Sequence, residues 1–135
     1  MARLILDTTI LIAAARRRLD LATISEDDDA AVPAVVVAEY LVGVHLTADA
    51  ARAADQRAFL DDVLAVAPIV DYTRDVAEHH AVLLAHVRRA GEPRGAHDLI
   101  VAASARATEQ TVLTADSRAR FDELPGVRVR LVSTR

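Results

Sequence analysis

Short apolar runs that end at a polar residue alternate along this chain with longer stretches in which apolar residues recur every three to four positions. The short runs predict buried strands, and the longer stretches predict helices that bury one face. Strands are expected at 2–6, 30–32, 68–70, 111–114 and 127–132. Helices are expected at 8–17, 34–46, 48–67, 74–89, 96–105 and 117–124. Strands that alternate with helices predict an α/β fold in which a mostly parallel sheet is flanked by helices.

The chain shows no repeat, no low-complexity segment and no interior linker, so residues 1–135 are expected to form a single domain. Hydrophobic residues make up 53% of the chain but aromatic residues only 3%, which predicts an aliphatic core. The acidic run at 25–29 is expected to be a solvated loop or the end of a helix. No apolar run approaches the ~20 residues of a membrane span, and no leader precedes the first strand. A soluble cytoplasmic protein is therefore expected.

Cysteine and lysine are both absent from the sequence. Without cysteine there are no disulfides, no thiolate catalysis and no cysteine-based zinc sites. All 16 basic residues are arginine, so phosphate chemistry that depends on a lysine, such as that of a Walker loop, is excluded. The net charge of −4 argues against a passive coat for nucleic acid.

Acidic residues follow three of the predicted strands. One of them, Asp71 after the strand at 68–70, is expected only to lead into a helix capped by Thr73, and the other two are candidates for a site. Asp7 comes after the apolar run at 4–6, and Asp116 comes two residues after the strand at 111–114. The carboxyl ends of parallel strands meet at one edge of the sheet, which is where α/β proteins bind ligands. The alternative is that each acid only caps the helix that follows it, by accepting a backbone hydrogen bond.

Two further acids are expected on helices close to that edge. Glu39 shares a helical stripe with Val35, Val36 and Val42, where a carboxylate is costly unless it is paired or bound to a cation. Its alternative is a place at the edge of the stripe, in contact with water. Asp98 lies in the first turn of an apolar helix, where the helix dipole alone favours an acid. The loop at 91–95 brings this turn to the same edge, so four carboxylates are expected to face one cleft.

Clustered carboxylates repel one another unless a cation offsets their charge. Oxygen ligands without cysteine suit Mg²⁺ or Mn²⁺ better than zinc. These ions hold phosphate oxygens and lower the pKa of bound water. The sequence offers no cysteine, no lysine and no evident pairing of serine with histidine. The hypothesis from the residues is therefore hydrolysis of a phosphodiester by metal-activated water.

Four short motifs in this order make the chain resemble the PIN-domain ribonucleases, specifically the VapC toxins of bacterial type II toxin–antitoxin pairs. The motifs are Leu-Asp-Thr-Thr at 6–9, Ala-Glu at 38–39, Gly-Ala-His-Asp-Leu-Ile-Val-Ala-Ala at 95–103 and Thr-Ala-Asp at 114–116. The resemblance extends over nearly all of 4–132. The chain departs from the family at and after Asp116. The family often has asparagine at the position of this fourth acid, and Phe121 comes later in this chain than is usual.

The resemblance implies a three-layer α/β/α sandwich and an endoribonuclease that cleaves RNA with Mg²⁺ or Mn²⁺. It assigns the catalytic and metal-binding roles to Asp7, Glu39, Asp98 and, less directly, Asp116. It also assigns supporting hydroxyls, and these match Thr8 and Thr114.

The resemblance further implies a homodimer that is neutralised by a cognate antitoxin. An amphipathic antitoxin segment would lie in an apolar groove, expected to involve the helices at 34–46 and 48–67. RNA would be held by arginine side chains at its phosphates. Arg94 and Arg118 are the predicted RNA contacts.

Two other classes of protein are compatible with parts of the pattern. A haloacid-dehalogenase-type phosphatase also begins with an acid at a strand end, but it needs a second Asp two residues later, where this chain has Thr9. A catalytically silent PIN-like module that only binds a partner would keep the same acids as helix caps. A charge retained at Glu39, among apolar residues, argues against that module.

Overall fold

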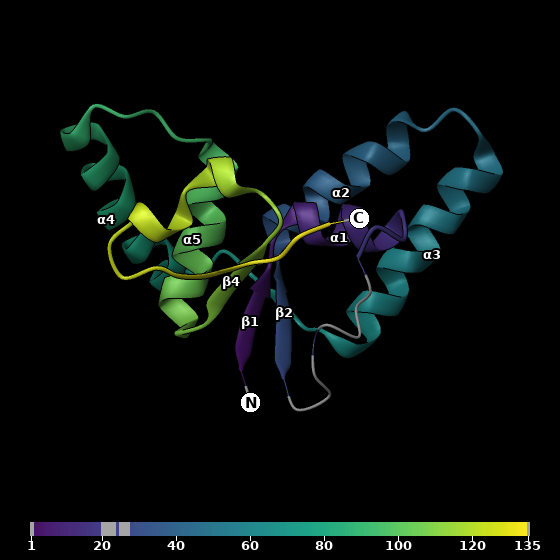
Figure 1. Ribbon diagram of the computed structural model, residues 1–135, viewed down its shortest axis with the longest axis horizontal. Helices are drawn as coiled ribbons and strands as arrows, with labels where there is room; N and C mark the ends of the chain where they lie inside the picture. The colour runs from purple at the N-terminus through teal and green to yellow at the C-terminus, as the bar shows by residue number, and fades with distance from the viewer. Residues whose placement is uncertain (1, 20–23, 25–27, 135) are drawn as a thin grey trace.

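The computed structural model describes residues 2–19, 24 and 28–134 of the chain (Figure 1). Its strands are β1 (Arg3–Leu6), β2 (Asp29–Pro33), β3 (Ile69–Val70), β4 (Thr111–Thr114) and β5 (Arg128–Leu131). Its α-helices are α1 (Thr8–Ala15), α2 (Ala34–Leu46), α3 (Ala50–Val66), α4 (Arg74–Ala90) and α5 (Ala96–Thr108). These elements confirm the strands and all but the last of the helices that the apolar pattern predicts, with small differences at their ends.

Within the described residues the strands form one sheet in the order β3–β2–β1–β4–β5, and every pairing is parallel. The central strand β1 is apolar along 4–6 because neighbouring strands and helices cover it on all sides. Leu6 of β1 is in register with Leu113 of β4. The next residues along these two strands, Asp7 and Thr114, are therefore brought together at the carboxyl edge of the sheet.

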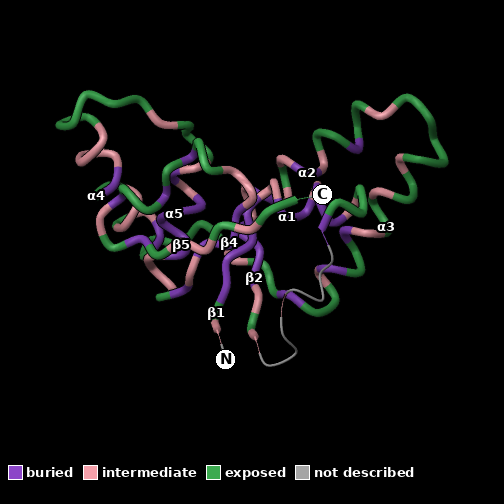
Figure 2. The backbone as a smooth tube through the Cα atoms, in the orientation of Figure 1, coloured by how far each residue is buried: buried purple, intermediate pink, exposed green. Residues whose placement is uncertain are grey.

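Helices cover both sides of the sheet and give the α/β/α arrangement expected from the sequence. In Figure 1, α4 and α5 lie on the left of β1 and β2, and α1, α2 and α3 lie on the right. The carboxyl ends of β1 and β2 point upward between these two groups of helices. Figure 2 shows that the buried residues concentrate along the sheet and the helix faces against it, while the outer parts of α3 and α4 are exposed. The edge where Asp7 lies thus opens between the two helical groups.

The prediction of one helix at 117–124 is wrong. Two short 3₁₀ turns, η2 (Ser117–Ala119) and η3 (Phe121–Glu123), replace it. Arg120 between them has a left-handed backbone with φ of 50°, a conformation that cannot continue a right-handed helix. The break turns Phe121 into the core, where it is 1% exposed.

The apolar stripe of α2 also differs from the expectation. The buried residues of this helix are Val36, Tyr40 and Val44, whereas Val42 is 55% exposed. Glu39 therefore lies beside the buried stripe rather than within it, and its side chain is 32% exposed. The reason is that α2 packs on the sheet and its neighbours along one line, and its other face is open.

The acidic run at 25–29 falls largely outside the described residues. Asp29 begins β2, and the carboxylate of Asp28 accepts a hydrogen bond from the backbone N–H of Ala2 at 2.8 Å. None of the described helices combines the length and the apolar character that crossing a bilayer requires.

Candidate active site at the carboxyl edge of the sheet

Asp7 is the most buried of the four predicted acids, with 5% of its surface exposed. Its Oδ1 accepts hydrogen bonds from the backbone N–H of Ile10, at 3.2 Å, and from the hydroxyl of Thr9. Its Oδ2 accepts a hydrogen bond from the hydroxyl of Thr114. The helix-capping interpretation of Asp7 is thus confirmed, but capping of α1 engages only one of its two oxygens.

Burial is the main reason why the pKa of the Asp7 carboxyl is raised above its ordinary value of 3.8. Hydrogen bonds from Thr114, Thr9 and Ile10 act in the opposite direction, and the charge of Asp116 adds to the rise. The carboxylate at the end of β1 is therefore ionised at a cost, and it lies close enough to Asp116 to be repelled by it.

Two threonines tie Asp7 to the end of β4. The hydroxyl of Thr9 accepts a hydrogen bond from the backbone N–H of Ala115 at 3.0 Å. Thr114 is 1% exposed, and its hydroxyl accepts a hydrogen bond from the backbone N–H of Asp116 at 3.0 Å. Since both hydroxyls also donate to Asp7, they fix the start of the segment that carries Asp116 against the end of β1.

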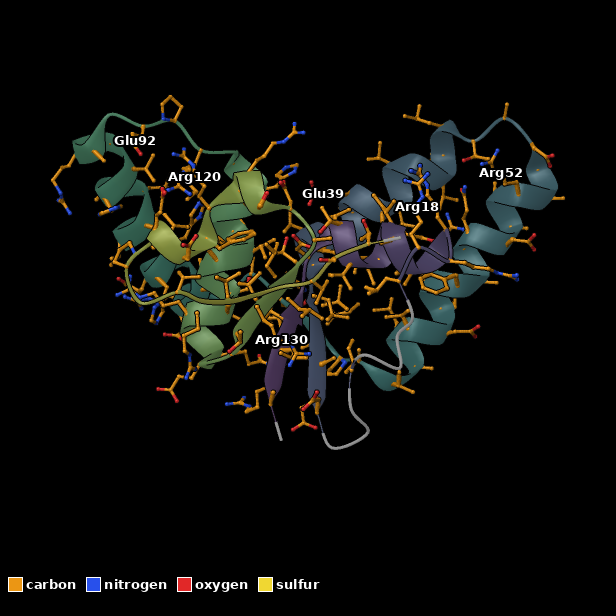
Figure 3. The ribbon with its side chains drawn as sticks, viewed as in Figure 1. Arg18, Glu39, Arg52, Glu92, Arg120 and Arg130 are labelled. Carbon is orange, nitrogen blue, oxygen red and sulfur yellow. The ribbon has the colours of Figure 1, made fainter. Side chains whose placement is uncertain are left out.

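Glu39 reaches this edge from α2, between the two helical groups (Figure 3). Its Oε1 accepts a hydrogen bond from the hydroxyl of Thr8 at 2.8 Å. Its Oε2 lies 3.2 Å from Nδ1 of His97, in the first turn of α5. Glu39 is thus held by residues from two other helices, although it is not buried in an apolar stripe.

Asp98 lies in the first turn of α5, and Gly95, the N-cap residue just before this helix, provides no side-chain cap. Burial raises the pKa of the Asp98 carboxyl above its ordinary value of 3.8, and the charges of Asp116, Asp7 and Glu39 raise it further. The charge of His97 has the smaller, opposite effect. The helix dipole favours an acid here, but three other carboxylates close by oppose its ionisation.

Asp116 is half-buried and follows β4 by two residues. Its Oδ1 accepts a hydrogen bond from the backbone N–H of Arg118 at 2.9 Å, so it caps the turn η2. The capping alternative for Asp116 is confirmed in this respect. Its charge nevertheless raises the pKa of both Asp7 and Asp98, and the charges of Asp7 and Glu39 also raise that of Asp98, so the four predicted acids lie near one another at the sheet edge.

The donors at this edge fit a hard divalent cation by their chemistry. They are carboxylate oxygens, and a cation among them would offset the repulsion that raises the pKa of Asp98. Among the described residues, no three histidine, aspartate or glutamate side chains already meet as a set of metal ligands. Glu39 in particular is engaged by Thr8 and His97. Metal binding would therefore draw carboxylates together from their present positions.

The two predicted RNA contacts have different surroundings. The side chain of Arg94 is only 8% exposed, and its guanidinium donates to the carbonyl oxygens of Ala119 and Arg120 and to Glu123. A guanidinium occupied in this way has few donors left for a phosphate, which argues against the predicted contact of Arg94 with RNA. Arg118 is exposed, and its contact with RNA stays a prediction.

Three residues of the site were not assigned a role by the sequence reasoning. Thr9 bonds to Asp7 and to Ala115, and His97 contacts Glu39. Gly95 leaves room for Asp98, because a Cβ at this position would lie 3.0 Å from Oδ2 of Asp98. All three belong to the motifs at 6–9 and 95–103, and membership of these motifs is the feature of the sequence that could have identified them.

A groove of about 960 Å³ lies beside the acids, between α1, α2 and α3. Apolar side chains that line it include Ile12, Tyr40, Val44 and Phe59. Arg16, Arg18 and Arg52 also line it, and Figure 3 shows Arg18 and Arg52 on the same side of the molecule. Glu39 lines the groove as well, so the groove continues to the acidic cluster. The expected groove between the helices at 34–46 and 48–67 thus exists, with α1 as a third wall.

Comparison with known proteins gives a consistent relationship over nearly the whole chain. The sequence profile of the PIN domain matches residues 4–127. A protein named ribonuclease VapC from Rickettsia bellii is 26% identical over 129 residues, which are 96% of each of the two chains.

Solved structures resemble the chain over a similar extent. One is VapBC-5 from Mycobacterium tuberculosis, described as a member of the VapBC family of toxin–antitoxin systems. It matches with a TM-score of 0.80 and 29% identity, over 98% of this chain and 100% of that chain. Another is VapBC2 from Rickettsia felis bound to a fragment of its promoter DNA, with a TM-score of 0.86 and 21% identity. That match covers 97% of this chain and 99% of the other, and it shows a shared fold.

Proposed function

Because this chain belongs to the PIN-domain family, we propose that it is an endoribonuclease dependent on Mg²⁺ or Mn²⁺ and acts as the toxin of a toxin–antitoxin pair. The name of the Rickettsia bellii relative supports the nuclease activity, and the Mycobacterium tuberculosis structure supports the toxin–antitoxin assignment. The observation that carries the proposal is the convergence of carboxylates on Asp98. Its pKa is raised by burial and then by the charges of Asp116, Asp7 and Glu39.

In this proposal Asp7, Glu39, Asp98 and Asp116 hold the metal ion. When bound, Mg²⁺ or Mn²⁺ supplies an activated water and neutralises phosphate oxygens. The chain's part is to keep the carboxylates ionised and oriented. Thr114 donates to Oδ2 of Asp7, which keeps that oxygen an acceptor, and Thr8 does the same for Oε1 of Glu39.

The proposal is tested by incubating the purified chain with total cellular RNA and with a synthetic single-stranded RNA. We expect fragments in Mn²⁺ or Mg²⁺ and none in EDTA. Cleavage that persists in EDTA would leave a nuclease but remove the metal from its mechanism. Absence of cleavage under every condition would contradict the nuclease and favour a module that only binds a partner.

The arrangement at Gly95 gives a more local prediction. Replacing Gly95 with alanine places a methyl group 3.0 Å from Oδ2 of Asp98, which is closer than these atoms normally approach. Because Oδ2 is the end of a rotatable side chain, the carboxylate moves while the backbone of α5 keeps its path. We expect the variant to fold normally and to bind Mn²⁺ about tenfold more weakly, at the low end of the range typical for disturbing a metal ligand's surroundings. Calorimetric titration measures this change.

The control for that variant is Gly43→Ala in α2, where a Cβ would meet nothing within 4 Å. This exchange should leave Mn²⁺ affinity unchanged and stabilise the helix by up to ~1 kcal/mol. Equal Mn²⁺ affinity in Gly95→Ala and the wild-type chain would show that Asp98 does not need its present position to bind metal.

We further propose that the antitoxin docks in the groove between α1, α2 and α3. The apolar side chains of Ile12, Tyr40 and Phe59 suit the apolar face of an amphipathic segment. Because Glu39 lines the same groove, a segment bound there lies next to the acidic cluster and can block it. We also propose the homodimer that the resemblance to the family implies. Light scattering of the purified chain tests it.

Filling the groove separates antitoxin binding from catalysis. Gly43 lines the groove with open space above it, so Gly43→Leu adds a side chain where the antitoxin would lie. We expect the variant to weaken binding of the antitoxin that co-purifies with the chain by at least about tenfold, or about 1.4 kcal/mol. Divalent-dependent RNA cleavage should stay unchanged. Gly43→Ala serves as the control that adds only a methyl group, and unaltered antitoxin binding by the leucine variant would contradict this docking site.

A further inference from the structure

Arg94 is a charged side chain that the proposed function does not yet use. It lies in the loop between α4 and α5, four residues before Asp98, and its side chain is 8% exposed. Nη1 donates to the carbonyl oxygens of Ala119 and Arg120, each at 2.7 Å, and Nη2 lies 2.9 Å from Oε2 of Glu123. Every one of these partners belongs to the segment that follows Asp116.

That segment depends on contacts from outside for its shape. It contains the two short turns η2 and η3, separated by Arg120 with a left-handed backbone. A non-glycine residue in this conformation is held by its surroundings, since it costs energy on its own. The two carbonyl oxygens that Arg94 binds belong to Arg120 and to the residue before it. Arg94 therefore stabilises the segment at its least regular point.

Arg120 makes two further ion pairs, one to the loop that carries Arg94 and one within its own segment. Nη1 of Arg120 lies 3.8 Å from Oε2 of Glu92 and 3.6 Å from Oε2 of Glu123. Figure 3 shows Glu92 and Arg120 together on the left-hand side of the molecule, away from the groove. These two pairs are exposed and contribute little by themselves. The buried guanidinium of Arg94 makes the more precise contact, because its planar group of donors fixes both the direction and the distance of the hydrogen bonds.

Asp116 is consequently held from two sides. On one side, the hydroxyl of Thr9 accepts a hydrogen bond from the backbone N–H of residue 115, and that of Thr114 accepts one from residue 116. On the other side, Arg94 binds the carbonyl oxygens three and four residues after Asp116. The loop of Arg94 leads directly into the first turn of α5, which carries Asp98. The contacts of Arg94 therefore fix the segment after Asp116 relative to Asp98.

We propose that Arg94 is a positioning residue that sets Asp116 relative to Asp98, and thereby the affinity of the site for its divalent ion. The proposal rests on the proposed metal-dependent function and adds a residue to it. Arg94 acts here through Asp116 and touches neither the ion nor RNA.

The test is a double-mutant cycle on Mn²⁺ affinity, measured by calorimetry with Arg94→Met, Asp116→Asn and the two combined. Methionine keeps much of the apolar stem and removes the donors. We expect each single variant to bind Mn²⁺ about tenfold more weakly. Because Arg94 acts through Asp116, the combined variant should bind no more weakly than Asp116→Asn alone. Arg89→Met is the control, since Arg89 is exposed at the end of α4 and its loss changes the net charge equally.

A loss that is equal in both backgrounds would overturn the proposal, because Arg94 would then act independently of Asp116. Unchanged Mn²⁺ affinity in Arg94→Met, with binding retained by the wild-type chain, would overturn it as well and leave the proposed function intact. A wild-type chain that binds no Mn²⁺ would overturn both. If the methionine variant fails to fold by circular dichroism, Glu123→Gln replaces it in the cycle. That variant keeps both carbonyl contacts and should show the same dependence on Asp116 with a smaller loss.

Discussion

Replacing Asp98 with asparagine is expected to reduce divalent-dependent RNA cleavage by about 10³-fold, equivalent to about 4 kcal/mol of transition-state stabilisation. The same change should stabilise the metal-free protein at neutral pH. The reason is that burial and three neighbouring carboxylates oppose the ionised form of Asp98. Asparagine keeps the shape of the side chain and removes the charge. Cleavage assays and urea denaturation in EDTA measure the two effects.

The stability difference has a defined dependence on pH. The pKa of Asp98 is raised in the folded protein above its ordinary value of 3.8, so the fold binds that proton more tightly than the unfolded chain does. The cost of ionisation is absent below the ordinary pKa and develops as pH rises through the raised one. The free energy of unfolding of Asp98→Asn should therefore equal that of the wild-type chain in acid, exceed it as pH rises through the raised pKa, and keep a constant excess above it.

Asp75 provides a matched control for this prediction. It also lies in the first turn of a helix, α4, but its side chain is 70% exposed and it pairs with His79, at 3.8 Å. Asp75→Asn should destabilise the protein by about 0.3–1 kcal/mol, because it removes a favourable charge from a helix N-terminus. Its cleavage activity should be unchanged. If Asp98→Asn behaved like Asp75→Asn in both respects, Asp98 would be a helix-end residue and nothing more.

Asp7 combines a structural and a chemical role, and two substitutions are expected to separate them. Asp7→Ala removes the N-cap of α1 and leaves the hydroxyls of Thr9 and Thr114 without their shared acceptor. We expect it to be less stable than Asp7→Asn by about 2–3 kcal/mol, from one lost cap and the unpaired polar groups. Asp7→Asn retains an acceptor for the cap and no longer buries a charge. It should be at least as stable as the metal-free wild-type chain.

Both Asp7 variants should lose cleavage to a similar extent, because neither supplies two carboxylate oxygens. Chemical denaturation and the RNA assay together distinguish the two roles. Asp49→Ala is the stability control, since Asp49 caps the exposed start of α3 and its loss should cost only about 1 kcal/mol. An active Asp7→Asn variant would show that the buried carboxylate is there for the cap alone.

The parts of this fold that could be predicted from the sequence are those that depend on local pattern. The apolar run at 4–6 and the alternation of strands with helices were sufficient for β1, for the parallel sheet and for the shared edge of Asp7 and Asp116. The segment at 117–124 could not be predicted in this way. Its apolar residues have helical spacing, but Arg120 is left-handed there, and the contact that stabilises it comes from Arg94, 26 positions earlier.

The same distinction applies to the candidate site. The four acids could be found from their places at strand ends and helix starts, and from the motifs that resemble the PIN domain. The position of Glu39 was expected for the wrong reason, because the buried stripe of α2 passes through Tyr40. Glu39 is held instead by Thr8 and by His97, 31 and 58 positions away, respectively. A sequence shows which residues can form such bonds but not which of them meet.

The central claim is that Asp98 and its neighbouring carboxylates form a divalent-metal site. The most direct measurement is a calorimetric titration of the wild-type chain and Asp98→Asn with Mn²⁺ at neutral pH. The account predicts saturable binding to the wild-type chain and a loss of at least about tenfold in affinity in the variant, because even disturbing the surroundings of a metal ligand costs about 10–100-fold. Equal binding by both proteins, or no binding by either, would contradict it.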